Sequence, residues 1–294
     1  MVSEKKIMLP HGPGFRLLSG FTGAALDDPN RLLLGYYYYR GDEWWLASDH
    51  FPEKPIMPAV ITLEVMVQNA IRRATTKTRG PFGLRKVESF MIHQQVKPET
   101  ELTLGAKICW GQNHENARIY CTASIGDKII AESTIRIQKL EFTFYCGSIE
   151  TTTLYENGVY DETGNYIGDR YYHSGKEEWS PSAPNLLMPG CMILEAGAQL
   201  AGQICGCNHL LDRKIFAVTA IKNVCFEQCV RPNTKLCLRA EIKWLKPGKQ
   251  CIAYCSAGYW FEDSEKSTYL TVVTNTEIEF SLMGHVTRKL ELKA

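Results

Sequence analysis

The residues best suited to chemistry lie in the first half of the chain, where a histidine precedes a proline-rich turn and a carboxylate follows within an apolar segment. The histidine is His50, directly before Phe51, and the carboxylate is Glu64. Imidazole titrates near neutral pH and is suited to removing a weakly acidic proton. A carboxylate among apolar residues is costly unless it is neutral, paired or functional.

A second copy of the carboxylate lies 131 positions later in an equivalent setting. Glu195 follows a second Met-Pro dipeptide, and Gln199 stands four residues after it, as Gln68 stands four residues after Glu64. Residues four apart lie on the same face of a helix. Two apolar helices that each carry one carboxylate indicate an internal repeat.

Each carboxylate is placed by a helix that a series of strands follows. The segment 59–71 is apolar on nearly every face, which predicts a helix in the interior of a domain, with its stop signal at 79–81. A second helix is predicted at 189–211. Alternating apolar residues predict antiparallel strands at 31–39, 87–95, 102–110, 117–124, 129–138, 216–228, 236–244, 250–259 and 269–280. The expected fold class is therefore α+β.

The repeat divides the chain into two expected domains, 1–140 and 141–294, with no low-complexity linker between them. Residues 94–98 match residues 228–232 at an offset of 134, so the repeat extends into the strands and the second helix-to-strand connection is three residues longer. The second half also contains a polar, tyrosine-rich insertion with a turn at 161–165.

Composition narrows the function classes. The chain has 294 residues and a formal net charge of +1, which gives no electrostatic footprint for nucleic acid. No apolar run reaches membrane-spanning length, and the first residues have no apolar segment typical of a secretory signal. The 11 cysteines are therefore expected to be reduced thiols in a cytoplasmic protein. The tract 205–209 holds two cysteines and a histidine, but its spacing is too tight for a zinc site.

With these motifs in view, the sequence resembles the β-hydroxyacyl-(acyl-carrier-protein) dehydratases of the FabZ/FabA type. The resemblance rests on His50-Phe51-Pro52, on Pro55-Ile56-Met57-Pro58 and on the spacing from Glu64 to Gln68. It covers the first half nearly end to end and the second from about residue 185 to residue 280. The doubled arrangement is similar to the dehydratase regions of polyketide and polyunsaturated-fatty-acid synthases. It implies a double hot dog fold, with two antiparallel sheets each wrapped around one central apolar helix.

The resemblance implies one live site and one vestigial site. In single-domain relatives two subunits build each site, one supplying a His and the other a Glu or Asp. Carried over, His50 of the first half would be the base and would face the acid, Glu195, of the second half. The position that mirrors His50 is Pro181, so the second site, with Glu64 and Gln68, would lack its base.

The resemblance also implies how a thioester would be held. The backbone N–H of Ala59, at a helix N-terminus, would stabilise the enolate-like oxygen, where the helix dipole adds positive potential. Gln199 would orient Glu195, and Phe51 would help to line an apolar tunnel. The family usually has Gly where this chain has Ala59, so the expected pocket differs by one methyl group.

The implied activity is removal of water from 3-hydroxyacyl thioesters on an acyl carrier protein to give trans-2-enoyl thioesters, in fatty acid or polyketide-type biosynthesis. The substrate would arrive on phosphopantetheine, and no metal or redox cofactor is expected. Arg72, Arg73, Lys77 and Arg79 could meet an acidic carrier protein, although a solvated helix end with favourable dipole charges explains the same cluster. Two domains in one chain would form a pseudo-dimer, so a monomer or a homodimer is expected.

Two other functions remain open. The first is a hot dog protein with weakened catalysis that binds acyl chains or scaffolds a synthase, which Ala59 and the missing second histidine favour. The second is a thioesterase or an enoyl isomerase, although a thioesterase needs no His-Phe-Pro motif. One fold hosts many functions, so the fold alone does not separate these alternatives.

Overall fold

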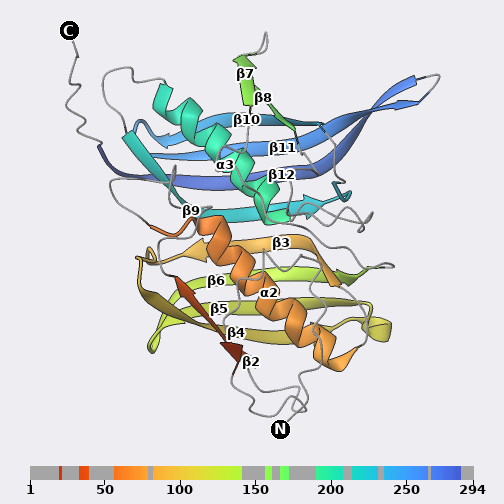
Figure 1. Cartoon of the computed structure of the whole chain (residues 1–294). Helices are drawn as coiled ribbons and strands as arrows, with labels where there is room; N and C mark the ends of the chain where they lie inside the picture. The colour runs from red at the N-terminus through yellow and green to blue at the C-terminus, as the bar shows by residue number, and fades with distance from the viewer. Residues whose placement is uncertain are drawn as a thin grey trace, which may run out of the picture.

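Among the residues that the structure describes, two long helices lie on one side of a twelve-stranded antiparallel sheet (Figure 1). The computed structural model describes residues 20–21, 33–39, 56–78, 82–140, 156–160, 166–171, 190–207, 214–230, 235–263 and 266–285. Within these ranges no helix is both long enough and apolar enough to cross a membrane. His50, Phe51 and Pro181 lie outside the described residues, so their expected roles stay predictions.

The helices of the described residues are α2 (Ala59–Lys77), α3 (Gly190–Cys207) and the short 3-10 helix η2 (Gln112–His114). The strands of the first half are β1 (Gly20–Phe21), β2 (Leu33–Tyr39), β3 (Phe82–Ile92), β4 (Thr100–Trp110), β5 (Asn116–Ile125) and β6 (Lys128–Lys139). Those of the second half are β7 (Glu156–Tyr160), β8 (Tyr166–Tyr171), β9 (Lys214–Phe226), β10 (Lys235–Lys246), β11 (Gln250–Asp263) and β12 (Lys266–His285).

The strand order has the symmetry of the sequence repeat. It runs β1-β2-β4-β5-β6-β3-β9-β12-β11-β10-β8-β7, so each half reads in the same way from its outer edge to the centre. At the centre β3 pairs with β9, for example Lys86 with Cys225 and Met91 with Ala220. The two sheets expected from the resemblance are thus continuous, which fixes the two halves side by side.

The tyrosine-rich segment is part of the repeat, so its interpretation as an insertion was wrong, whereas the predicted turn at 161–165 lies outside the described residues, between two strands that pair. Its residues form the hairpin β7–β8 on either side of 161–165. Tyr166 of β8 pairs with Ala240 of β10, as Leu33 of β2 pairs with Ala106 of β4. Strands near a sheet edge carry polar residues that limit edge-to-edge association, so their composition resembles that of a loop.

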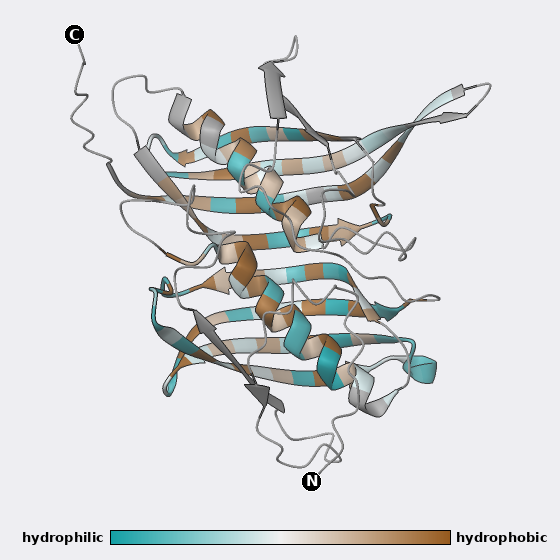
Figure 2. Cartoon of the chain, in the orientation of Figure 1, coloured by the Kyte–Doolittle hydropathy of each residue, from teal (hydrophilic) through white to brown (hydrophobic). Residues whose placement is uncertain are grey.

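The helices are buried because their apolar faces pack on the sheet. The α2 helix contacts β2 to β6, and α3 contacts β8 to β11. Apolar bands on the strands and on both helices meet in one core (Figure 2). Val60, Leu63 and Leu200 are fully buried there, and full burial of such a side chain stabilises the fold by about 1.5–3 kcal/mol.

The repeat extends to individual side-chain contacts. The rings of Phe82 and Trp110 meet edge to face, with centroids 5.9 Å apart and an interplanar angle of 61°. Phe216 and Trp244 stand 134 positions later and meet at 5.7 Å and 62°. Equivalent positions in the two halves therefore have equivalent environments, which allows the two halves to be compared residue by residue.

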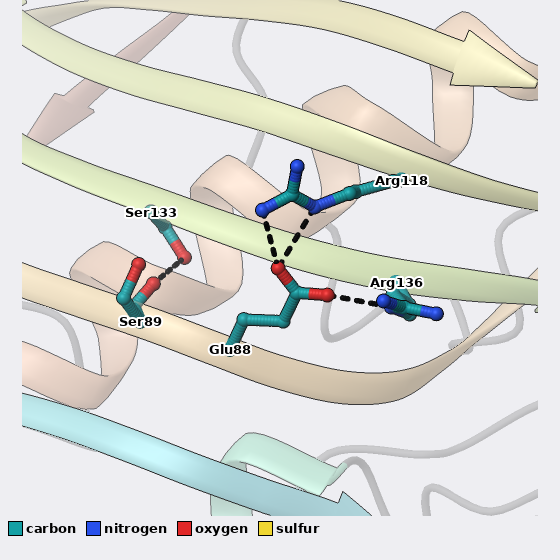
Figure 3. A network of polar contacts seen from close by, with 5 residues as sticks. All are labelled: Glu88, Ser89, Arg118, Ser133 and Arg136. Atoms are coloured by element: carbon teal, nitrogen blue, oxygen red, sulfur yellow. Dashed lines mark hydrogen bonds and ion pairs between the residues drawn. The ribbon is translucent and has the colours of Figure 1, made fainter.

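Polar contacts join β3 to β5 and β6 in the first half (Figure 3). Glu88 of β3 accepts hydrogen bonds from Arg118 of β5 at 2.8 Å and from Arg136 of β6 at 2.6 Å. Ser133 of β6 donates to the Ser89 carbonyl of β3 at 2.9 Å. Burial alone would raise the pKa of Glu88, but the hydrogen bonds from Arg136 and Arg118 outweigh it and hold the pKa below its ordinary value.

Candidate active site

A cavity of about 510 Å³ is shared by the two halves of the chain. Its wall comes from the start of α2, from one face of α3, from the end of β3 and the segment 93–96 after it, and from β9 and β12. The lining residues are Ile56, Met57, Ala59, Ile92, His93, Gln94, Gln95, Val96, Glu195, Ala198, Gln199, Gly202, Phe216, Ala217, Val218, Thr219, Phe280, Ser281, Leu282 and Met283. Thirteen of these twenty residues are apolar or glycine, and seven have polar side chains that can orient a ligand.

The first half contributes the N-terminus of α2 to the cavity. Pro58 precedes the helix with φ −57° and ψ 140°, and its carbonyl accepts from the amides of Ile61 and Thr62 at 3.1 Å. The Ala59 amide therefore comes before the first hydrogen bonds of the helix, where N–H groups have no acceptor within the helix. The Met57 amide donates to the Val96 carbonyl at 3.0 Å, which ties the approach to the helix to the cavity wall.

The second half contributes a carboxyl group on the same cavity. Glu195 of α3 is 7% exposed, and Gln199 donates from Nε2 to Glu195 Oε1 at 3.0 Å. The pair is one helical turn apart, as the sequence spacing predicts. The fold therefore brings Ala59 and Glu195, 136 positions apart in the sequence, to the wall of one cavity.

The mirror-image carboxyl group is sealed. Glu64 is 1% exposed and accepts from Gln68 Nε2 at 2.9 Å. The thiol of Cys191, on the first turn of α3, also lies against Glu64, and burial together with this carboxylate raises the pKa of Cys191 well above its ordinary value. Glu64 thus faces the start of α3, and neither Glu64 nor Gln68 belongs to the wall of the cavity.

The predicted basic cluster on α2 is only partly at the surface. Arg73 is 5% exposed, so for this residue both interpretations, a contact with a carrier protein and a solvated helix end, were wrong. Arg72 is half-buried, and the side chains of Lys77 and Arg79 lie outside the described residues. A helix packed on a sheet hides even long basic side chains on its inner side, which charge spacing in the sequence does not reveal.

Much of the cavity wall was not predicted from the sequence. Ile92 ends β3 and Val96 follows it, whereas Phe216 and Phe280 come from β9 and β12 of the other half. The match between residues 94–98 and residues 228–232 pointed to the segment after β3, because it marks a repeated structural feature. No signal of that kind marked the β9 and β12 residues, whose place in the wall depends on the pairing of β3 with β9.

Comparison with protein families places both halves in related groups. Residues 38–132 match the ApeI-like family, described as ApeI dehydratase, and residues 183–266 match the FabA-like domain. Each half of the chain therefore matches one of these family models over part of its length. The resemblance to FabA-type dehydratases that the sequence motifs indicated is thereby confirmed. None of the curated proteins matches the chain by overall sequence similarity.

Solved structures share the fold of this chain. The dehydratase domain of PpsC from Mycobacterium tuberculosis, in complex with C12:1-CoA, is 12% identical with a TM-score of 0.53, covering 91% of this chain and 98% of that one. The dehydratase domain of the CurK module of the curacin polyketide synthase is 14% identical with a TM-score of 0.51, at the same coverages. The 12:0-ACP thioesterase from Umbellularia californica is 6% identical with a TM-score of 0.54, covering 85% and 94%. These similarities show a fold of the hot dog type.

Proposed function

We propose that the chain is a hydro-lyase that converts 3-hydroxyacyl thioesters into trans-2-enoyl thioesters. The observation that carries the proposal is the cavity shared by the first turn of α2 and the Glu195–Gln199 pair of α3. A helix N-terminus and a carboxyl group on one apolar cavity suit a reaction that builds negative charge on an oxygen and then expels water. The dehydratase-family match of both halves supports the same reaction.

In the proposed mechanism three groups act on the substrate. His50 removes a proton from C2, and the Ala59 amide donates to the thioester oxygen while negative charge collects there. The C3–O bond then breaks, the hydroxyl group takes a proton from the Glu195 carboxyl, and water leaves as the C2–C3 double bond forms. The proton on His50 returns to Glu195 to complete the cycle.

The position of Glu195 suits the role of an acid. Gln199 donates from Nε2 to Oε1 of Glu195, which orients the carboxyl group beside the cavity. Glu195 and its partner belong to one rigid helix, so the acid keeps its position relative to the N-terminus of α2. Proton transfer from a positioned group of this kind contributes about 10²–10⁴ in rate.

The two symmetry-related carboxylates provide a matched test. In the Glu195→Gln variant, kcat for 3-hydroxyacyl-pantetheine thioesters should fall by a factor of about 10²–10⁴, measured by absorbance of the enoyl thioester. The Glu64→Gln variant changes the same residue type on the other helix, away from the cavity, and should keep activity near that of the wild type. Equal activity of wild type and Glu195→Gln would refute the proposal, and a His50→Ala variant tests the base separately.

A thioesterase is among the structures that share this fold, so thioesterase activity has to be distinguished from dehydration. The same assay does this through the products. Hydrolysis of the thioester would release a free thiol, which a thiol reagent detects, whereas dehydration leaves the thioester intact. Binding of a thioester with neither product would indicate a protein that only holds acyl chains. A product with its double bond at C3 would indicate an additional isomerase activity.

The proposal also covers the carrier of the substrate and the oligomeric state of the protein. We place the substrate on the phosphopantetheine arm of an acyl carrier protein, in fatty acid or polyketide-type biosynthesis, because dehydratase families act on such chains. The division into domains 1–140 and 141–294 lets a single chain contain both contributors to the cavity. A monomer is then sufficient for activity, and size-exclusion chromatography with light scattering distinguishes it from a homodimer.

A further inference from the structure

The two halves differ at the positions that enclose the cavity. Equivalent positions follow from the offset of 131 in the helices and 134 in the strands, which the paired aromatic contacts support. At three of these positions the cavity side has a smaller residue than the other half. The three pairs are Ile92 with Phe226, Ala198 with Val67, and Gly202 with Ile71.

Small residues on α3 leave the cavity hollow. Ala198 and Gly202 both line it, and a methyl group built on Gly202 would meet no neighbouring atom within 4 Å. Their counterparts on α2, Val67 and Ile71, are each 1% exposed and belong to the packed core. The same helix face therefore encloses space in one half and fills it in the other.

An aromatic ring covers the N-terminus of α3. A methyl group built on Gly190 would stand 2.7 Å from two ring carbons of Phe226, so the ring lies directly against the first residue of the helix. Phe226 is 8% exposed. Its backbone carbonyl accepts from Arg85 of β3, and Arg85 also pairs with Glu227 at 3.0 Å. The backbone at Phe226 is thus held by contacts across the β3–β9 junction.

The equivalent position beside α2 has a branched aliphatic side chain instead. Ile92 ends β3 as Phe226 ends β9, and the next residue in each case donates its amide across the sheet at 2.8 Å, His93 to Ile130 and Glu227 to Val272. The backbone hydrogen bond that follows the strand is the same in both halves, whereas the side chains of Ile92 and Phe226 differ. The methyl group of Ala59 fits beside an isoleucine, whereas Gly190 has to be glycine beside a phenyl ring.

We propose that these three residue differences decide which helix N-terminus receives an acyl chain, with Gly202 setting the length of chain that the open half accepts. This inference rests on the proposed function for the nature of the ligand. The half-site at Gly190 is closed by Phe226, Val67 and Ile71, whatever its catalytic groups. The half-site at Ala59 accepts a thioester because Ile92, Ala198 and Gly202 leave room for its alkyl chain.

Binding of non-reacting thioether analogues of acyl-pantetheine tests the inference apart from catalysis. Calorimetric titration of the wild type should give one binding equivalent for both the butyl and the dodecyl analogue. Gly202→Ile should weaken binding of the dodecyl analogue by at least about tenfold, because several methylene groups lose their burial. Binding of the butyl analogue should weaken by less than about twofold. Gly202→Ala is the matched control for a change in helix backbone, and Ala198→Val is a second, milder filling of the same space.

The reverse substitution opens the closed half. Phe226→Ile should add a second binding equivalent for the butyl analogue but not for the dodecyl analogue, because Val67 and Ile71 still fill the deeper space. Failure of the wild type to bind, equal affinities of wild type, Gly202→Ile and Ala198→Val for the dodecyl analogue, or a single equivalent in folded Phe226→Ile would each overturn the inference. Binding with these patterns but without turnover would refute only the proposed dehydration.

Discussion

The Ala59→Pro substitution removes one N–H group from the proposed site while leaving the helix intact. Proline is favoured in the first turn of a helix, where its missing N–H is not needed. The first hydrogen bonds of α2 come from Ile61 and Thr62 to the Pro58 carbonyl, so the Ala59 amide is not part of the ladder. Pro58 has φ −57° and ψ 140°, an extended conformation that a following proline favours.

The expected loss follows from the role of the amide. Removing one oxyanion donor costs about 10²–10³ in kcat, or about 2.7–4 kcal/mol of transition-state stabilisation. The Val60 amide is the next N–H group without an acceptor in the helix, and it stays available at the same end of α2. We therefore expect a loss near the lower end of that range, about 10² in kcat.

The assay compares dehydration by wild type, Ala59→Pro and Ala59→Gly. The glycine variant keeps the N–H group and removes only the methyl group, so its kcat should stay within about threefold of the wild type. Binding of a thioether analogue, which has no carbonyl oxygen, reports whether the proline ring blocks the cavity. Far-UV circular dichroism and the thermal midpoint confirm that α2 is formed.

Two results would contradict this reasoning. A folded Ala59→Pro protein with kcat near that of the wild type would show that the Ala59 amide does not stabilise the transition state. A loss of thioether binding as large as the loss of kcat would show that the proline ring acts by steric exclusion. In either case the oxyanion role would have to move to another donor on the cavity wall.

Three further predictions concern stability and thiol reactivity. Glu88 contributes stability above its unfolded pKa because its two arginine partners, against the effect of burial, hold its folded pKa low, and this contribution is lost as pH falls through the folded pKa. Glu88→Gln should therefore cost about 1 kcal/mol in urea unfolding at neutral pH, with the difference shrinking below about pH 4; a constant difference would contradict the assignment. Gly190→Ala should destabilise the fold by about 1–3 kcal/mol through contact with the Phe226 ring, and this cost should fall in a Phe226→Ile background, so additive effects would argue against the contact. In a pulse of iodoacetamide followed by peptide mass spectrometry, exposed Cys109 should react well before Cys121, whose burial raises its pKa; equal labelling of folded protein would refute the burial.

Local sequence patterns were sufficient to predict the helices and most of the strands. The run from Ala59 onward is apolar on nearly every face, which predicts a buried helix, and the structure has α2 there. The spacing of Glu195 and Gln199 placed both on one helix face, where they hydrogen-bond. The predicted strand 87–95 began too late, as β3 starts at Phe82. The early residues of β3 pair with neighbours that are distant in the sequence, so local patterns do not reveal where the strand begins.

The repeat was visible in the sequence, but its completeness was not. The Met-Pro dipeptide, the Glu and Gln of each helix and the segment 94–98 recur in the second half of the sequence. The β7–β8 hairpin repeats only in its pairing, as its partner β10 corresponds to β4, and its residues share no motif with β1 and β2. Strand pairing uses backbone groups that every residue carries, so it leaves little trace in composition.

The sequence by itself determined that two apolar helices each carry a carboxyl group and a glutamine, because residue type and helical spacing are local properties. Only the tertiary structure decided that the carboxyl group of Glu195 faces a cavity while that of Glu64 is sealed. Whether space is hollow or filled depends on side chains from several elements at once, here the β3–β9 junction and the facing helix. The ring of Phe226 against Gly190 is a contact of that kind, since neither residue determines it without the sheet that joins them.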